Sequence, residues 1–224
     1  HPAAVADAPG AVVIFTAREL RAINQYRHKR LASLQAVMAR KQKGSRRWKR
    51  LARRKMFLRT RNKRQRRDIE HTVTRAITND AKEAGAKRLV VGDVRTIGTG
   101  KRLNTNAQQN VSGWSHGRQL QYLTYKRAAF GIALERQSEA YSSNTCPCCG
   151  AHNKPNGRRS CCSACGFVGH RDAVGAINQV RKAVHGSYGH VSPTSVMYRR
   201  PFRRRSSRDT GHVARGQPRE AAAL

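Results

Sequence analysis

Apolar positions at the start of the chain form a short continuous run, typical of a buried strand, and then recur with helical spacing. The run AVVIF at 11–15 predicts a strand, and the Asp-Ala-Pro-Gly turn before it predicts a hairpin over 2–15. Thr16 and Glu19 then fit a capping box, in which the two side chains satisfy first-turn amides. The helix that follows places these apolar residues roughly on one face: Leu20, Ile23, Leu31, Leu34 and Met38.

Two further helical segments follow. Gly44 ends the first helix, and Ser45 fits the N-cap of a second segment that carries Trp48, Leu51 and Leu58. A third segment has apolar residues every three or four positions, at Ile69, Val73, Ile77, Ala81 and Ala84. Gly85 punctuates its end.

The next stretch alternates between strand and helix. Residues 87–94, KRLVVGDV, predict a buried strand, and 98–117 is typical of a loop. A helix is expected over 115–129, ending at Gly131, and a second strand over 132–136. This alternation predicts an α/β fold with part of the sheet parallel.

The charge of the chain indicates a polyanionic partner. Lys and Arg number 46 against 12 Asp and Glu, and the stretch 18–67 holds 21 basic residues with Glu19 as its one acid. Nucleic acid is the simplest partner, because each neutralised phosphate releases counterions. A ribosomal-type or histone-like binder stays open. A membrane surface is disfavoured, since no broad Trp/Phe/Leu face accompanies the charge.

The two ends of the chain also carry expectations. No apolar run is long enough to span a bilayer, and the first residues lack the basic start of a signal peptide. The chain opens without Met, so we expect a fragment of a longer protein. Residues 186–224 are polar, Arg-rich and aperiodic, and we expect a mostly disordered basic tail.

All six cysteines lie in one short stretch. Cys146 and Cys149 form one CxxCG knuckle, and Cys162 and Cys165 form another after twelve residues. Four thiolates at this spacing predict a closed, structural zinc site, with Gly supporting each tight turn. The remaining Cys148 and Cys161 are left out of the ligand set.

Several motifs together resemble a known family. They are SRRWKRLARRK from Ser45, VVGD at 90–93, LTYK at 123–126, EAYSSNTC at 139–146, the paired CxxCG, and HRDAVGAIN at 170–178. In this order they resemble the TnpB-type proteins of insertion elements and the related type V CRISPR effectors. The resemblance runs from about residue 2 to residue 184. It implies an RNA-guided DNA nuclease with a RuvC-like, RNase H-fold domain and a zinc ribbon before the last catalytic Asp.

The resemblance also implies three acids that hold Mg²⁺ ions for phosphodiester cleavage. Asp172 matches the third acid, although an Asp at a helix start has the simpler explanation of favouring the helix dipole. The second acid is where this chain departs from the pattern, because Gly92 occupies its position. The first acid is expected before His1, since Asp7 lies in a turn.

Two replacements for the second acid are open, Glu139 and Glu135, and a dead site is the remaining possibility. Asp93 would point to the opposite face if Gly92 points inward, because side chains alternate along a strand. Glu139 lies near the end of the next strand and is the preferred carboxylate, with Glu135 or a dead site as the alternatives.

These observations predict an α/β, RNase H-like (RuvC-like) mixed sheet that lacks its first strand. We expect a partial nuclease domain at 1–144 with a basic helical insertion at 16–84, a zinc ribbon at 145–168, a final helix at 169–184 and the tail at 185–224. The residues expected to contact nucleic acid are Arg46, Arg47, Lys49, Arg50, Arg53, Arg54, Arg158 and Arg159. For the last two, plain solvent exposure is a nearly equal alternative.

The predicted function is RNA-guided, divalent-metal-dependent DNA cleavage by a mobile-element protein in a prokaryotic cytoplasm, near the nucleoid. Its partners would be DNA and a guide RNA, with structural Zn²⁺ and catalytic Mg²⁺ as cofactors. A nuclease-dead RNA-guided binding protein is the alternative, and Gly92 favours it. A plain zinc-ribbon RNA binder is the third interpretation, under which Asp172→Ala would change nothing.

Overall fold

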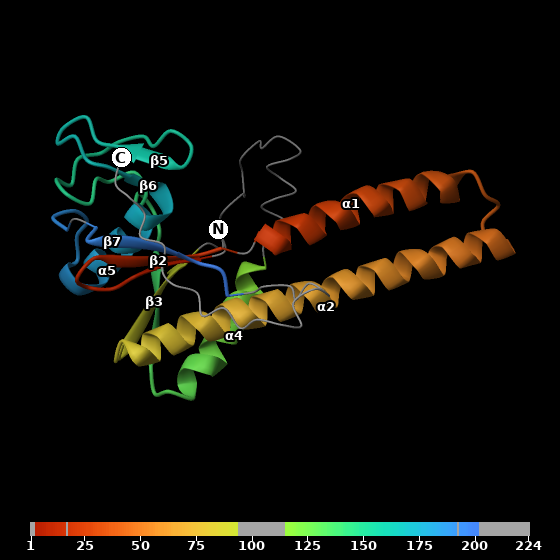
Figure 1. Cartoon of the computed structure of the whole chain (residues 1–224), viewed down its shortest axis with the longest axis horizontal. Coiled ribbons are helices and arrows are strands. Elements are labelled where there is room, and N and C mark those ends of the chain that lie inside the picture. Colours follow the sequence, from red (N-terminus) through yellow and green to blue (C-terminus); the bar gives the residue numbers. More distant parts are fainter. Residues whose placement is uncertain (1–2, 17, 94–114, 192, 202–224) are drawn as a thin grey trace, which may run out of the picture. The chain divides into compact units, whose positions relative to one another are not determined.

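A computed structural model describes residues 3–16, 18–93, 115–191 and 193–201. Its elements are β1 (Ala3–Ala6), β2 (Ala11–Phe15), α1 (Arg18–Ala39), α2 (Arg46–Glu83), β3 (Arg88–Asp93), α4 (His116–Ala128), β4 (Ala133–Ser138), β5 (Arg159–Cys161), β6 (Val168–His170), α5 (Arg171–His185) and β7 (Ser195–Arg199) (Figure 1). The chain divides into two compact units, His1–Thr16 with Ser142–Leu224, and Ala17–Tyr141.

The first unit is built on a three-stranded sheet. β1 and β2 form the predicted antiparallel hairpin, in which the carboxylate of Asp7 accepts a hydrogen bond from the Ala11 N–H at 2.7 Å. Helix α5 packs on the sheet through a core that has apolar side chains on both sides: Val12, Ile14, Ala173 and Ile177. Burial of these residues fixes which face of α5 lies on the sheet.

The tail differs from its prediction. Within the stretch that we expect to be disordered, β7 pairs with β2 in parallel, so that Val196 lies opposite Val12. The Arg199 carbonyl accepts hydrogen bonds from Thr16, at 2.8 Å from the backbone N–H and at 3.3 Å from the hydroxyl. The Thr16 hydroxyl, which the sequence predicts as a helix cap, therefore donates to β7 instead, and α1 begins at Arg18. The predicted disorder is wrong for this strand, because β2 is a distant partner that local composition does not reveal.

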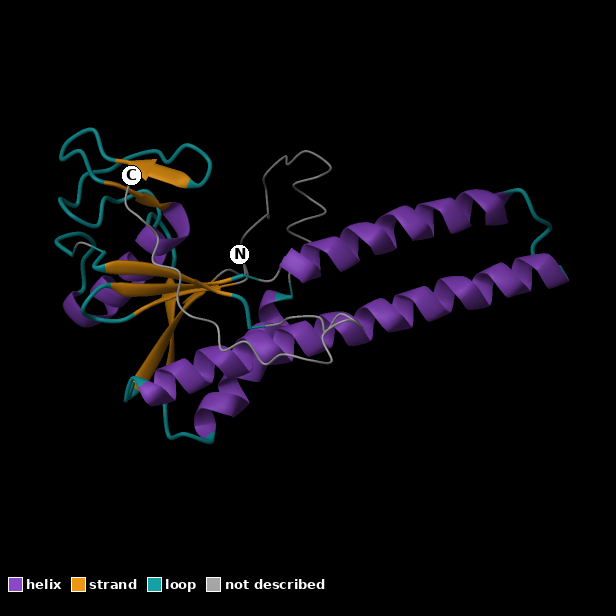
Figure 2. Cartoon of the chain, viewed as in Figure 1, coloured by secondary structure: helices purple, strands orange, loops and turns teal. Residues whose placement is uncertain are grey.

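The second unit contains a long helical hairpin. Figure 2 shows α1 and α2 running beside each other along most of α1. Gly44 has a φ of +90° in the connection, and the hydroxyl of Ser45 caps α2 by accepting from the Trp48 N–H at 3.2 Å, as predicted. The two helical segments predicted after Ser45 are one continuous helix of 38 residues.

A parallel strand pair completes the second unit. β3 and β4 lie side by side in register, with Gly92 opposite Gln137 and Asp93 opposite Ser138. Helix α4 connects back to β4 and packs against α2. The buried apolar residues Ile69, Val73 and Ile77 line α2 there. The two units thus contain antiparallel and parallel pairs, and the predicted mixed α/β class is confirmed.

Candidate functional site

The four predicted metal ligands converge in the first unit. The sulfurs of Cys146, Cys149, Cys162 and Cys165 all lie within 4.8 Å of one another. Cys146 is 3.6 Å from Cys165, and Cys149 is 3.5 Å from Cys162, measured between Sγ atoms. Tetrahedral zinc with Zn–S bonds of about 2.3 Å places its sulfurs about 3.8 Å apart. The four thiols therefore form a set that fits a structural metal ion.

Both knuckles turn as the sequence predicts. The Gly150 N–H donates to the Cys146 carbonyl and the Gly166 N–H donates to the Cys162 carbonyl, each at 3.0 Å. The two glycines have φ values of +74° and +73°, which L side chains rarely adopt. Cys148 and Cys161 lie outside the cluster in the part of the chain that the structure describes.

Asn153 joins the two knuckles, a role that the sequence analysis missed. Its side-chain Nδ2 donates to Cys162 Sγ at 3.2 Å and to the Ala151 carbonyl at 3.1 Å. Its Oδ1 accepts from the Ser163 N–H at 3.3 Å. Such outer contacts orient metal ligands. The signal in the sequence is only an Asn, one of two within the spacer, and Asn is typical of any turn.

The pKa of Cys162 reflects its setting in the second knuckle. Burial raises this pKa, but hydrogen bonds from the backbone N–H groups of Cys165 and Ala164 outweigh burial and lower it to about 6. Side-chain hydrogen bonds with Cys149 and Cys165 act in the same direction, and a lowered pKa favours the thiolate, the form that binds metal.

Glu139 lies over Gly92 in the second unit. A Cβ atom added to Gly92 would overlap the carboxylate end of the Glu139 side chain. Glu139 follows the last residue of β4, and Gly92 is near the end of the parallel strand β3. Glu139 thus fills the space that a side chain at position 92 would need, which is the position where the resemblance expects an acid.

The neighbourhood of Glu139 is acidic. Burial raises the pKa of Glu139, and the charge of Asp93 raises it further. Strand alternation predicts Asp93 on the opposite face, yet its charge still acts on Glu139. Two carboxylates in a partly buried position repel each other, and a divalent cation relieves such repulsion. Their hard oxygen donors are the ligands that Mg²⁺ prefers. Glu135 instead pairs with Arg88 across the two strands, at 3.2 Å.

Asp172 lies in the first turn of α5, in the first unit. Its side chain is 41% exposed, and its Oδ2 is 3.9 Å from Nδ1 of His170. His170 is the N-cap of the helix, since its Nδ1 accepts from the Asp172 N–H at 3.2 Å. Burial lowers the pKa of His170 although the Asp172 charge acts to raise it. The carboxylate of Asp172 is therefore partly open to solvent rather than engaged in capping.

Asn178 is a second structural residue that sequence reasoning missed. It is fully buried, and its Nδ2 donates to the carbonyls of Ser142 and Thr145 at 2.7 and 2.8 Å. Its Oδ1 accepts from the Gly189 N–H at 3.3 Å. Asn178 therefore ties α5 to the segment that enters the ribbon. A polar residue one position after the buried Ile177 is the only local signal.

The predicted nucleic-acid contacts are all exposed. Six of them lie in the first turns of α2, and two lie on the ribbon: Arg46, Arg47, Lys49, Arg50, Arg53, Arg54, Arg158 and Arg159. None is buried, so each can reach a phosphate without repacking the core. Within the described residues, no helix combines the length and the apolar character needed to cross a membrane.

Two family models match the chain. One, described as a probable transposase, matches residues 1–98, and the other, the Cas12f1-like TNB domain, matches residues 116–179. The chain is a TnpB-like, type V-related protein. The second match contains the four-cysteine cluster and Asp172. No curated protein matches the chain significantly.

Two solved structures of type V effectors have a similar fold. One is a cryo-EM structure of a Cas12f1–sgRNA–target DNA complex, with a TM-score of 0.56, 14% identity, and coverage of 81% of this chain and 49% of that one. The other is a CRISPR–Cas12f ternary complex, with a TM-score of 0.60, 14% identity, and coverage of 80% and 38%. The TnpB-like chain thus spans about half or less of the length of these proteins.

Proposed function

We propose that this TnpB-like chain supplies the RuvC-like, DNA-cleaving part of an RNA-guided endonuclease. The observation that carries the proposal is the placement of Glu139 in the space beside Gly92. A chain that had merely lost its second acid would have no reason to keep a partly buried carboxylate there, because burial raises its pKa and disfavours its charged form. Retaining such a carboxylate at a strand end is typical of functional sites.

Glu139 and Asp172 are the carboxylates proposed to hold divalent metal, with Mg²⁺ as the preferred ion. When bound, the metal supplies an activated water and a charge that stabilises the leaving oxygen. Asp172 presents a partly exposed carboxylate at a helix start that His170 caps. The ribbon supports this helix start directly, since β6 ends at His170 and α5 begins at Arg171. Structural Zn²⁺ in the four-cysteine cluster would hold that connection rigid.

The proposed partners are a guide RNA and its DNA target, by analogy with the Cas12f1–sgRNA–target DNA complex of similar fold. The exposed basic residues at the start of α2, and Arg158 and Arg159 of the ribbon, would bind phosphates. We propose that the protein acts on DNA in a prokaryotic cell, close to the nucleoid.

The test is plasmid cleavage by the protein as its gene encodes it, loaded with the guide RNA from its own locus, in Mg²⁺. Glu139→Ala and Asp172→Ala should each lower the cleavage rate about 100-fold or more, by analogy with the loss of other transition-state-stabilising groups. The double variant should lose little more than either single variant, because groups that act as a unit are not additive. Glu135→Ala is the matched control and should cleave normally, since Glu135 pairs with Arg88.

A nuclease-dead, RNA-guided DNA-binding protein is the second candidate, and Gly92 favours it. Under this alternative the wild-type protein binds a matched target but leaves it intact in Mg²⁺. Glu139→Ala would then change neither binding nor cleavage. Cleavage that persists in both single variants would instead refute the assignment of these two carboxylates.

A further inference from the structure

A buried acid lies inside the most basic part of the chain. The side chain of Glu70, in the middle of α2, is 0% exposed. The same helix carries a long run of Lys and Arg residues on its exposed positions. Removing a carboxylate from water is costly unless it is paired with charge and hydrogen bonds. The contacts of Glu70 therefore show what the fold gains from burying it.

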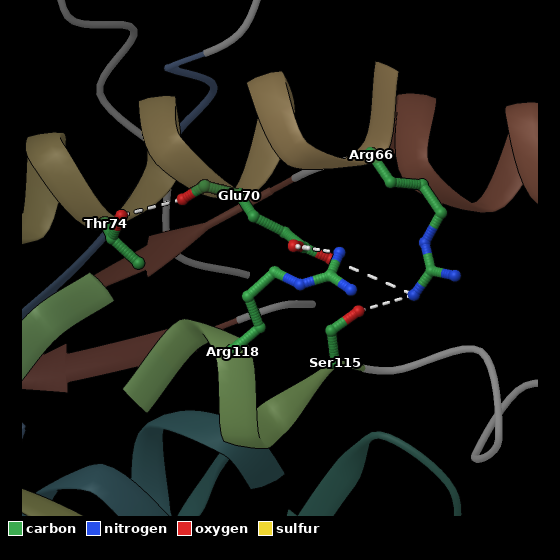
Figure 3. Close-up of polar contacts among 5 residues, drawn as sticks. All are labelled: Arg66, Glu70, Thr74, Ser115 and Arg118. Carbon is green, nitrogen blue, oxygen red and sulfur yellow. Dashed lines mark hydrogen bonds and ion pairs between the residues drawn. The ribbon is translucent and has the colours of Figure 1, made fainter. Parts of the chain in front are cut away.

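Two arginines from different helices meet at this carboxylate (Figure 3). Arg118, on α4, donates from Nη1 to Glu70 Oε2 at 3.3 Å. Arg66, one turn before Glu70 on α2, places Nη2 3.8 Å from Oε1. The same Arg66 nitrogen donates to the hydroxyl of Ser115, the residue before α4. Glu70 thus has a guanidinium group beside each carboxylate oxygen, hydrogen-bonded at Oε2 and at ion-pair distance at Oε1.

The arginines are less buried than the acid that holds them. The side chain of Arg66 is 17% exposed and that of Arg118 is 36% exposed. A guanidinium has several N–H donors in a planar fork, so one that contacts a single carboxylate oxygen can still donate hydrogen bonds to other acceptors. The buried end of the cluster is the acid, and the accessible end is cationic.

Further positive charge surrounds Arg66. Burial lowers the pKa of Arg27 on α1, and the charges of Arg66 and Arg59 lower it further. These like charges therefore act on one another across the α1–α2 hairpin. Together with Arg118 they make four positive charges, and Glu70 offsets one of them. The remaining charge matches an anion that arrives from solvent.

A purely structural clamp between α2 and α4 is the simpler explanation of Glu70. Such a clamp needs one arginine, and a hydrophobic residue of similar size often stabilises as well as a buried ion pair. Two arginines around one acid place two positive charges next to each other, which such a clamp does not require. Without the acid, Arg66 and Arg118 would repel each other, so Glu70 is the group that keeps them side by side.

We propose that Glu70 positions Arg66 and Arg118 as a paired clamp for a backbone phosphate of nucleic acid. The inference rests on the proposed nucleic-acid-binding function and adds a specific phosphate site to it. Paired guanidinium groups bind phosphate oxygens with defined geometry, which a scattered basic surface does not provide. Glu70 is then a positioning residue, because it acts through the arginines.

The distinguishing test is the direction in which affinity changes when an acid is removed. In a phosphate-binding protein, neutralising an acid ordinarily tightens binding by reducing repulsion. Glu70→Gln should do the opposite and weaken binding about three- to tenfold, because the arginine pair separates. The slope of log affinity against log salt should become shallower by about 0.7, the value expected when one fewer phosphate of a single strand is neutralised. The probe is a fluorescein-labelled, mixed-sequence single-stranded DNA of about thirty nucleotides, titrated into the zinc-loaded 224-residue chain.

Asp68→Asn is the matched control. Asp68 is exposed, lies two residues from Glu70 on the same helix, and its replacement changes the net charge equally. This variant should bind as tightly as the wild type or more tightly. If Glu70→Gln also binds as tightly as Asp68→Asn, the positioning role is refuted, while binding by the wild type still supports the proposed function. If the wild type itself fails to bind, the proposed function falls and this inference falls with it.

A second pair of variants keeps the inference testable if Glu70→Gln does not fold, as judged by helix content and melting. Arg118→Gln removes one half of the proposed clamp, and Arg88→Gln removes an arginine from the more exposed Arg88–Glu135 pair of the same unit. Each change lowers the net charge by one. Arg118→Gln should weaken binding several-fold more than Arg88→Gln, and equal losses would refute the clamp.

Discussion

Single acidic residues have a large influence in a chain with so few of them. Glu70 is fully buried and Glu139 is partly buried, but their surroundings are opposite. The charge of Asp93 adds to the burial of Glu139 and raises its pKa, whereas Glu70 faces Arg66 and Arg118. Among the described residues, the charge that shifts the pKa of Glu139 is therefore that of another acid, whereas positive charges face Glu70.

Glu139→Gln should stabilise the protein while it abolishes cleavage. The folded-state pKa of Glu139 is raised, so above that pKa the carboxylate is charged in both states and its burial opposes folding. As pH falls through the folded-state pKa, the carboxylate takes up a proton and the penalty disappears. The variant should therefore melt at a higher temperature than the wild type at pH 7–8, and the difference should shrink towards pH 4.

Thermal melts in metal-free buffer across this pH range measure the effect. Glu135→Gln serves as the control and should show no gain, because Glu135 already pairs with Arg88. Adding Mg²⁺ should raise the melting temperature of the wild type and leave Glu139→Gln unchanged, since the proposed metal site requires the Glu139 carboxylate. A variant that melts lower than the wild type at neutral pH would contradict the placement of Glu139.

The sequence predicts helix ends and the cysteine cluster well, because the signals for both are local. Gly44, Ser45 and Gly85 mark the ends of α2, and the spacing of the four cysteines sets the metal cluster. The region 59–68 carries no apolar repeat, yet its Arg, Lys and Gln residues are strong helix formers and keep α2 continuous. Short apolar runs separated by polar ones therefore predict two segments where the chain forms a single helix.

Contacts between distant segments are the part that the sequence does not reveal. Asn178 reaches Ser142 and Thr145, and Asn153 reaches Cys162, by hydrogen bonds whose partners are set by tertiary structure. The position of Glu139 over Gly92 could be predicted only because a family pattern places an acid at 92 and parallel strands bring their ends together.

Strand β7 should contribute to the stability of the first unit despite its Arg-rich surroundings. Truncation after Val191 removes the parallel partner of β2, the half-buried Val196 and the Arg199 carbonyl that Thr16 contacts. Removing one apolar side chain and several strand hydrogen bonds should cost about 2–4 kcal/mol. Denaturant unfolding of the zinc-loaded chain measures this cost.

Truncation after Arg200 is the matched control for that strand. It removes a longer stretch of basic composition than β7 itself but leaves β7 intact, because the described hydrogen bonds of the strand end at Arg199. The free energy of unfolding should then stay close to that of the full chain. Equal stability of both truncated forms would show that β7 does not hold the sheet.

The net charge of the whole molecule governs folding and binding in opposite ways. A formal charge of +34 on 224 residues opposes compaction through self-repulsion, and the same charge attracts polyanions. Salt screens both effects, since the Debye length falls from about 10 Å at 0.1 M to about 3 Å at 1 M. Screening therefore reduces charge repulsion within the free protein but weakens its complexes with polyanions.

Raising NaCl from 0.1 to 1 M should increase the melting temperature of the free chain and decrease the extra stability that nucleic acid confers. The first effect should be roughly 2–4 °C for each kcal/mol of repulsion screened. The second follows because the stabilisation by a ligand depends on its concentration relative to a Kd that rises steeply with salt. Melting curves with and without excess single-stranded DNA should therefore converge, and KCl should reproduce them. A free chain whose melting temperature falls with salt would mean that ion pairs such as Glu70–Arg118 outweigh the repulsion among the other charges.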